Sequence, residues 1–136
     1  MYYEIKLKVN KVGEKSGEEK EVKEHYITDV DLFAEAEQKG LELYASDNME
    51  CDVFGISRSN IIEIVNKKEE DKPFFKATIV GIQIDDKGKV VEKKYYNLVC
   101  AKDVREANVI MEQHLSQGLS DMRLDGIVKT KILELI

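Results

Sequence analysis

The chain has 136 residues, of which 43% are hydrophobic and 35% charged, a balance that excludes an intrinsically disordered protein. Its net charge is −6 and it has only three arginines (Arg58, Arg105 and Arg123), which excludes strong unaided binding to duplex DNA or an anionic membrane. A nucleic-acid site therefore requires a local basic patch. No run approaches the roughly 18 apolar residues of a membrane span, and no signal-peptide pattern is present. We expect a soluble, cytoplasmic protein with reduced cysteines.

The N-terminal segment predicts a β-hairpin. Apolar and charged residues alternate over residues 3–9, which is the period of a strand with one solvent-exposed face. Residues 13–20 form a polar turn that contains glycine, and residues 21–28 have the composition of the returning strand.

A helix and a third extended segment follow this hairpin. Asp29 and Asp31 provide side-chain oxygens where the helix begins, and apolar residues then recur at helical spacing. We expect this helix to end near residues 46–48. Residues 51–65 form a long extended segment that bends near Gly55.

The second half predicts the same order of elements. Residues 75–84 and 90–100 form two strands, joined by a turn over residues 85–88 whose aspartates and glycine favour a hairpin. A second helix spans approximately residues 103–118, and residues 122–136 supply the last extended segment.

The sequence also repeats itself at one constant offset. Gly17 falls on Gly88 and Gly55 falls on Gly126, so the offset is 71 residues. Residues 58–64 then fall on residues 129–135, with matching polar and apolar positions. A register that extends from the first turn to the C-terminus indicates a duplicated structural unit.

The repeat leads to a prediction of fold class. We expect an α+β fold of tandem duplicated β-β-α-β units that form one mostly antiparallel sheet, with two helices on one face. The halves are residues 1–66 and 73–136, joined by the charged stretch 67–72. Because a half of this size buries too little surface to fold alone, the prediction is a single domain over residues 1–136.

The strongest candidate binding site is a polar insert in the last extended segment of each half. It comprises Ser57, Arg58, Ser59 and Asn60 in the first half, and Lys129, Thr130 and Lys131 in the second. Hydroxyl, amide and cationic groups at matching places can hold a phosphate or a carboxylate. The alternative is that these are ordinary polar residues of a half-exposed strand.

Three aromatic pairs also stand out: Tyr2-Tyr3, Phe74-Phe75 and Tyr95-Tyr96. Each pair sends one ring to either face of a sheet, so the outward rings can stack on nucleobases or, alternatively, pack and self-associate. Neighbouring glutamates repel a phosphate chain, which favours packing or self-association.

No pattern in the sequence specifies a reaction. His25 and His114 lie in different elements without other ligands at metal spacing, and no glycine-flanked nucleophile or phosphate-cradling glycine loop is present. We therefore predict no catalytic residues, no metal and no cofactor.

The order of several motifs resembles a known family. The motifs lie in residues 3–9, 23–30, 33–37, 52–60, 63–64 and 74–77, and residues 132–134 form a similar apolar finish. Their sequence and spacing are similar to the family catalogued as domain of unknown function 4494, found in gut Bacteroidetes and in their phages and mobile elements. The resemblance implies a one-domain cytoplasmic protein in a phage or host setting, with no assigned activity. Arg58 falls within the family pattern, whereas the last residues depart from the aromatic-proline ending of the family.

These observations favour a non-enzymatic binding module, associated with a phage or a mobile element. Its expected ligand is anionic, either single-stranded nucleic acid or a nucleotide, held by Arg58, Ser59, Asn60, Lys129 and Lys131. We also expect a homo-oligomer. One alternative is an anti-defence protein, which would either sequester a signalling nucleotide or inhibit a host protein. The other is a purely structural domain that mediates protein–protein interactions.

Overall fold

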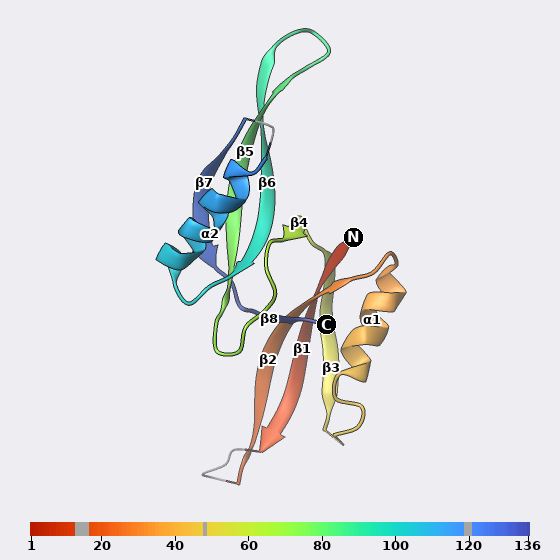
Figure 1. Cartoon of the computed structure of the whole chain (residues 1–136). Coiled ribbons are helices and arrows are strands. Elements are labelled where there is room, and N and C mark those ends of the chain that lie inside the picture. Colours follow the sequence, from red (N-terminus) through yellow and green to blue (C-terminus); the bar gives the residue numbers. More distant parts are fainter. Residues whose placement is uncertain (13–16, 48, 119–120) are drawn as a thin grey trace. The chain divides into compact units, whose positions relative to one another are not determined.

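The computed structural model describes residues 1–12, 17–47, 49–118 and 121–136, and it divides into two compact units. Unit 1 comprises Met1–Ser59 together with Lys131–Ile136, and unit 2 comprises Asn60–Thr130. Each unit has a four-stranded sheet and one helix, in agreement with the predicted α+β class (Figure 1). Neither described helix is long and apolar enough to cross a membrane.

Unit 1 contains a sheet of strand order β3-β1-β2-β8. Its elements are β1 (Tyr2–Val12), β2 (Glu19–Asp29), α1 (Phe33–Glu42), β3 (Cys51–Arg58) and β8 (Ile132–Leu135). β1 pairs with β2 and β3 in antiparallel orientation, whereas β8 adds to β2 in parallel.

The core of unit 1 lies between the sheet and α1. Ile5, Leu7 and Val9 alternate along β1 and are fully buried with Ala36 of α1. Gly40 lets the helix come close to the sheet, because a Cβ at this position would lie 3.1 Å from Ile5 Cγ2. The predicted two-residue period of β1 therefore gives one face to the core and the other to solvent.

Unit 2 contains a sheet of strand order β4-β6-β5-β7. Its elements are β4 (Ile61–Ile64), β5 (Phe74–Ile84), β6 (Val90–Cys100), α2 (Val104–Ser116) and β7 (Met122–Lys129). β5 pairs with β6 and β7 in antiparallel orientation, and β4 adds to β6 in parallel.

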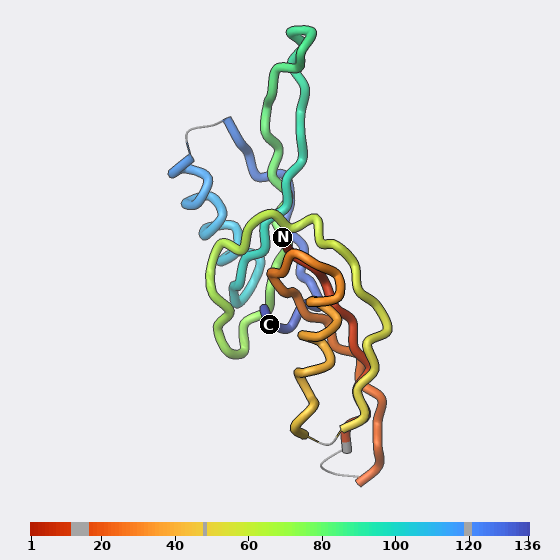
Figure 2. The backbone as a smooth tube through the Cα atoms, turned by 90° about the vertical axis from the view of Figure 1, so that its right-hand side faces the viewer, coloured from red at the N-terminus to blue at the C-terminus, as the bar shows by residue number. Residues whose placement is uncertain are grey.

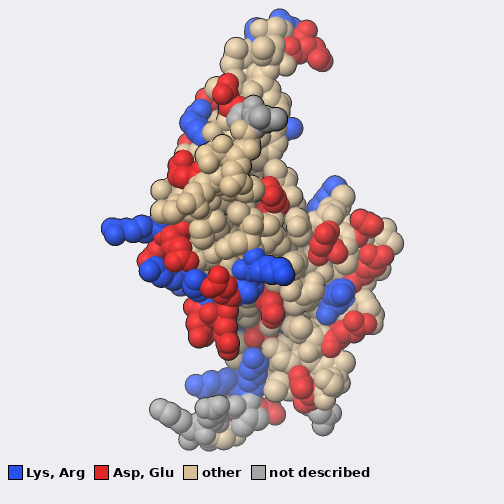
Figure 3. Space-filling model, in the orientation of Figure 1, with Lys and Arg blue, Asp and Glu red and all other residues tan. Residues whose placement is uncertain are grey.

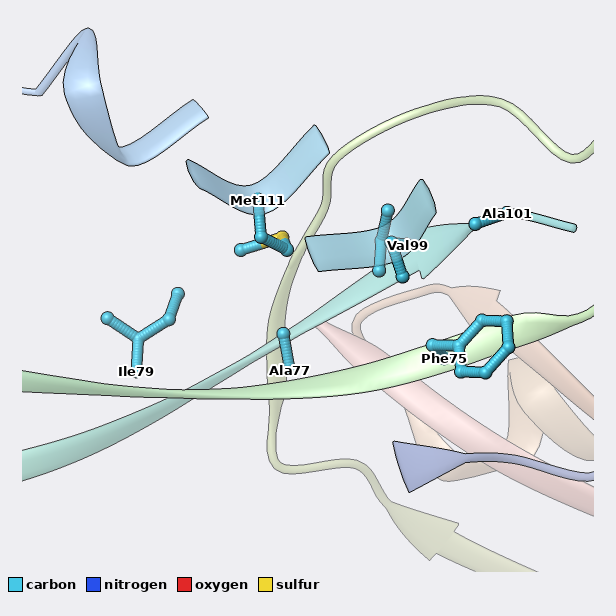
Figure 4. Close-up of a cluster of buried hydrophobic side chains, with 7 residues drawn as sticks. Phe75, Ala77, Ile79, Val99, Ala101 and Met111 are labelled. Carbon is cyan, nitrogen blue, oxygen red and sulfur yellow. The ribbon is translucent and has the colours of Figure 1, made fainter. Parts of the chain in front are cut away.

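Helix α2 closes the core of unit 2. Ala107 and Met111 of this helix are fully buried and belong to the cluster drawn in Figure 4. Their neighbours on β5 and β6 are Phe75, Ala77, Ile79 and Val99, with Ala101 just beyond β6. Asp103 caps α2, since its Oδ1 accepts a hydrogen bond of 2.8 Å from Glu106 N.

The two units exchange their short parallel strands. β4 follows β3 in the chain but pairs with β6 of unit 2, and β8 follows β7 but pairs with β2 of unit 1. Ile132 lies opposite His25, and Ile61 lies opposite Tyr96. By the 71-residue offset, Ile61 corresponds to Ile132 and His25 corresponds to Tyr96. The strand exchange is therefore duplicated along with the rest of the unit.

This exchange makes the prediction of one sheet wrong. There are two mixed sheets, and each helix covers its own sheet rather than a shared face. The sequence period identifies which residues of a strand are buried, but it does not identify the neighbouring strand. The compact units also divide the chain differently from the repeat halves 1–66 and 73–136, while the single domain over residues 1–136 stays a prediction.

The start and the end of α1 also differ from the prediction. Its N-cap residue is Leu32, which makes no side-chain capping bond, and Asp29 Oδ1 instead accepts from the N-terminal ammonium at 2.8 Å. The helix ends at Glu42, before residues 46–48, of which Asn48 lies outside the described residues.

The second hairpin turn is confirmed. Asp85 Oδ1 accepts hydrogen bonds from the amides of Lys87 and Lys89, and Gly88 has a φ of +77°. In the first predicted turn, residues 13–16 lie outside the described part of the chain.

Candidate functional site

An irregularity in β3 exposes an aromatic ring beside several lysines. Lys6 lies opposite Gly55 and Leu7 lies opposite Val53, so Phe54 is the additional residue of a β-bulge. The side chain of Phe54 is 43% exposed. Because Leu7 faces α1, Lys6 and Phe54 belong to the opposite face of the sheet. The bulge lies beside Gly55, where the sequence predicts a bend.

Two lysines lie over this ring. Lys8 Nζ is 5.0 Å from the centroid of the Phe54 ring, and Lys23 Nζ is 6.0 Å from it. Lys8 and Lys23 also face each other across β1 and β2. The electron-rich face of Phe54 thus reduces the repulsion between two cations, although such contacts contribute only about 0.5–1 kcal/mol at exposed sites.

These residues border a pocket within unit 1, which we call the lysine pocket. Its volume is about 320 Å³, and it is lined by Lys6, Lys23, Glu24, His25, Phe54, Lys131 and Leu133. The three lysines come from β1, from β2 and from the residue before β8, and all three are exposed. The parallel addition of β8 beside β2 therefore brings Lys131 to residues that are more than a hundred positions away in the chain.

Two carboxylates near the lysine pocket, those of Glu4 and Glu24, have partners in the protein. Glu4 Oε1 lies 2.9 Å from His25 Nε2, and Glu4 Oε2 accepts a hydrogen bond of 2.7 Å from Ser59 Oγ. Glu24 Oε2 accepts from Lys11 Nζ at 3.1 Å. The lining that the structure describes contains three lysines and a single carboxylate, that of Glu24, so an anion is the ligand that this pocket favours electrostatically although the whole chain is acidic.

The structure divides the predicted site residues between the units. Lys131 lines the lysine pocket. Arg58 lies opposite Tyr3 at the end of β3, and strand alternation places it on the α1 face, away from this pocket. Ser59 is engaged with Glu4. Asn60 and Lys129 are exposed residues of unit 2, and Lys129 pairs with Phe75 at the end of β7.

Sequence reasoning missed Lys6, Lys23 and Phe54. The available signal was the Phe54-Gly55 pair inside a strand, because glycine at such a position often marks a bulge. The lysines of β1 and β2 gave no signal of their own, since alternating charged residues are typical of any solvated sheet face.

The aromatic pairs have different environments. Phe74 and Phe75 are buried, with 0% and 3% exposure, so packing is the correct interpretation for this pair. Lys76 Nζ lies 4.5 Å from the centroid of the Tyr96 ring, and Tyr95 Oη accepts from Gln83 Nε2 at 2.5 Å.

A second polar cluster lies on the α1 side of unit 1, and we call it the Glu24 cluster. Glu24 is 8% exposed, and its Oε1 accepts from the hydroxyl of Tyr26 at 3.1 Å and from the hydroxyl of Tyr44. Burial raises the pKa of Tyr26 well above its ordinary value, and hydrogen bonds with Glu24 and Tyr44 raise the pKa of Lys11. The donors and acceptors of this cluster are paired with each other. A structural role, in which the cluster joins β2 to the segment after α1 by hydrogen bonds, therefore explains it.

Metal binding has no comparable basis in the described residues. Across residues 1–12, 17–47, 49–118 and 121–136, no group of three or more His, Cys, Asp or Glu residues is arranged to hold a metal ion. Burial raises the pKa of Cys51, which disfavours the thiolate form that binds soft metals.

Comparison with known proteins identifies one family. The model of the family described as "Domain of unknown function (DUF4494)" matches residues 1–136. A search of the curated proteins and a search of the solved structures found no match.

Proposed function

The chain belongs to the DUF4494 family, and we propose that it is a non-enzymatic binding module for an anionic ligand, specifically a nucleotide, and that it self-associates. The observation that carries the proposal is the group of three lysines around the half-exposed ring of Phe54 in the lysine pocket. Lysines attract a phosphate group, while an aromatic ring provides a surface for a nucleobase.

The size of the lysine pocket supports a small ligand. Its volume of about 320 Å³ lies at the lower end of the roughly 300–1,000 Å³ typical of ligand sites. The three lysine side chains are long and exposed, and Lys23 can turn from the Phe54 ring to a phosphate without disturbing the core.

The distribution of charge argues against an extended nucleic-acid track. On the face drawn in Figure 3, Lys and Arg side chains are interspersed with Asp and Glu, and the net charge of the chain is −6. Non-specific binding to nucleic acid depends on several phosphate contacts and weakens steeply with salt. A local site for one or two phosphates agrees better with this surface.

Replacing Lys131 by Gln should weaken the binding of AMP at least about tenfold, because one charge-assisted hydrogen bond contributes roughly 1.5–3 kcal/mol. Lys6→Gln should have a similar effect, and Phe54→Leu should reduce the preference for AMP over inorganic phosphate. Isothermal titration calorimetry of the purified chain measures each affinity. Lys87→Gln, in the β5–β6 turn of unit 2, is the matched control and should bind AMP like the wild type.

The same titrations separate the alternatives. A short oligothymidylate that binds with a steep salt dependence while AMP does not bind would replace the nucleotide by single-stranded nucleic acid. An equal loss in the Lys87 control would mean that only net charge matters, and the site proposal would fail. If neither probe binds, a structural or protein-inhibitor role replaces ligand binding.

Self-association is supported by the outer part of the β5–β6 hairpin. β7 pairs with β5 only as far as Gly81, so the hairpin continues beyond its neighbours (Figure 2). Ile82, Ile84 and Val90 in this part are 51%, 74% and 68% exposed. We call residues 82–91 the aliphatic arm. The corresponding part of the β1–β2 hairpin is polar, with Asn10, Lys11 and Lys20.

Substituting Ile84 by Lys should shift a homo-oligomer toward the monomer, with an apparent dissociation constant that rises at least about tenfold. The physical reason is that a contact which buries this side chain would have to desolvate a charge. Analytical ultracentrifugation over a range of concentrations measures the change. Val109→Lys is the matched control, since Val109 is a 50% exposed aliphatic residue on α2. A monomeric wild type, or equal dissociation in the control, would contradict the assignment to the arm.

A further inference from the structure

A buried amide in unit 2 has an oxygen without a hydrogen-bond partner. Asn97 lies on β6 and is 3% exposed, and its Oδ1 has no partner among the residues that the structure describes. Buried polar atoms are nearly always paired in folded proteins, because an unpaired one costs about 1–3 kcal/mol. Asn97 therefore requires an explanation other than packing.

Asn97 lines a pocket of about 160 Å³ within unit 2, which we call the Asn97 pocket. The aliphatic side chains of Ile79, Leu115 and Met122 contribute walls, and Glu63, Tyr95 and His114 contribute polar groups. Its volume is close to that of an engineered cavity of about 150 Å³ that holds one benzene ring. The space thus fits a single six-membered ring rather than a whole nucleotide.

A carboxylate, that of Glu63, borders this pocket. Glu63 Oε2 lies 3.3 Å from His114 Nε2, and the carboxylate of Glu63 is half-exposed. Tyr95 Oη accepts a hydrogen bond from Gln83 and retains its own O–H as a donor. A ligand with an N–H donor satisfies Asn97 Oδ1, and the negative charge of Glu63 nearby favours the same kind of ligand.

The internal repeat supplies an independent observation. By the 71-residue offset, Asn97 corresponds to Tyr26 and Leu115 corresponds to Tyr44. In unit 1 the hydroxyls of both tyrosines donate hydrogen bonds to Glu24 Oε1. In unit 2 the smaller side chains of Asn97 and Leu115 stand at these positions of the repeat, and both line the open Asn97 pocket, where the amide oxygen of Asn97 has no partner among the described residues.

We propose that the Asn97 pocket binds a small planar heterocycle that carries an amino group next to a ring nitrogen. The amide of Asn97 pairs with such an edge through its oxygen and its nitrogen, as asparagine does with adenine. Ile79, Leu115 and Met122 pack against the ring. This site lies in unit 2 and does not depend on the lysine pocket of unit 1.

The test uses 2-aminopyrimidine as the probe, with pyrimidine as a control of nearly equal size that lacks the amino donor. Amide chemical-shift changes in two-dimensional NMR of the full chain give the location and the affinity. We expect 2-aminopyrimidine to shift the signals of Ile79, Asn97 and Leu115, and to bind at least about tenfold more tightly than pyrimidine. Asn97→Leu should abolish this preference while thermal unfolding occurs at the same or a higher temperature, because an unpaired buried group is removed.

A second variant keeps the test decisive if Asn97→Leu does not fold. Leu115→Tyr introduces the residue found at the equivalent position of unit 1, and the added ring should fill the pocket and eliminate probe binding. Equal affinity for the two probes, unchanged affinity in either folded variant, or ordered water alone at Asn97 in a crystal soaked with 2-aminopyrimidine would overturn the proposal.

Discussion

Removal of residues 131–136 should destabilise unit 1, although these residues follow the last strand of unit 2 in the chain. They contain β8, the fourth strand of the unit 1 sheet, where Ile132 is only 6% exposed. Ile136 N donates to Ile27 O at 2.9 Å, and the Thr28 hydroxyl donates to Ile136 O at 2.9 Å. Loss of a buried isoleucine and of several hydrogen bonds costs on the order of 5 kcal/mol, comparable to the whole stability of a small domain.

Hydrogen exchange followed by mass spectrometry measures this effect peptide by peptide. The truncated chain should lose protection in β1 and β2 first, while β5 and β6 retain theirs. The reciprocal variant is Ile61→Asp, which introduces a charge at the 4% exposed position of β4 and should release β6. Leu133→Asp is the matched control in β8, since Leu133 is 45% exposed. Loss of protection in β6 rather than β2 after truncation would contradict the strand exchange.

Replacing Glu24 by Leu should lower the free energy of unfolding by about 2–4 kcal/mol. The substitution leaves the hydroxyl of Tyr26, a residue 6% exposed, without its acceptor, and it removes the acceptor of Tyr44 as well. Urea denaturation of the variant and of the wild type measures the difference. Adding Tyr26→Phe and Tyr44→Phe should recover part of the loss, because the unpaired hydroxyls are then absent.

An exposed glutamate of the same strand provides the control for this cluster. Glu21→Leu should change stability by no more than about 0.5 kcal/mol, as is usual for surface substitutions. If Glu24→Leu and Glu21→Leu lower the free energy of unfolding equally, the effect comes from the loss of a negative charge on β2 and not from the Glu24 cluster.

The dependence of stability on alkaline pH provides a second test of the Glu24 cluster. Burial raises the pKa of Tyr26, and hydrogen bonds raise the pKa of Lys11 above its ordinary value of 10.5. The folded state therefore retains protons that the unfolded chain releases above about pH 10, and the free energy of unfolding falls as the pH rises beyond that point. Tyr26→Phe should make this fall shallower, because one of the two titrating groups is removed.

The elements of this fold could be predicted from the sequence more readily than their assembly. Alternation and turn residues located β1, β2, β5 and β6, because the period of a half-buried strand is local information. The assignment of β4 and β8 to sheets could not be predicted, since each has only four residues and pairs in parallel with a strand distant in the chain. The absence of a side-chain cap at Leu32 likewise depends on tertiary contacts that override the local preference for Asp.

The residues of the candidate sites could be predicted from the sequence only in part. Lys131 was identified as a cation in the duplicated polar insert, but its neighbours Lys6 and Lys23 come from other strands and meet it only through the sheet order. Phe54 reaches this face because a bulge leaves it unpaired. Asn97 carried no signal by itself, although its alignment with Tyr26 in the repeat marks a place where the two units differ.

The exchange of β4 and β8 has a consequence for the order in which the protein folds as it is synthesised. The hydroxyl of Thr28 donates a hydrogen bond to Ile136 O, 108 residues later in the chain. Unit 1 therefore begins to be synthesised before unit 2 but is completed after it. Unit 2 has all of its strands once Lys129 has been made, and it can fold earlier. Between the synthesis of β2 and that of β8, the edge of β2 is open to pairing with other chains, so translation is a stage at which mispairing can occur.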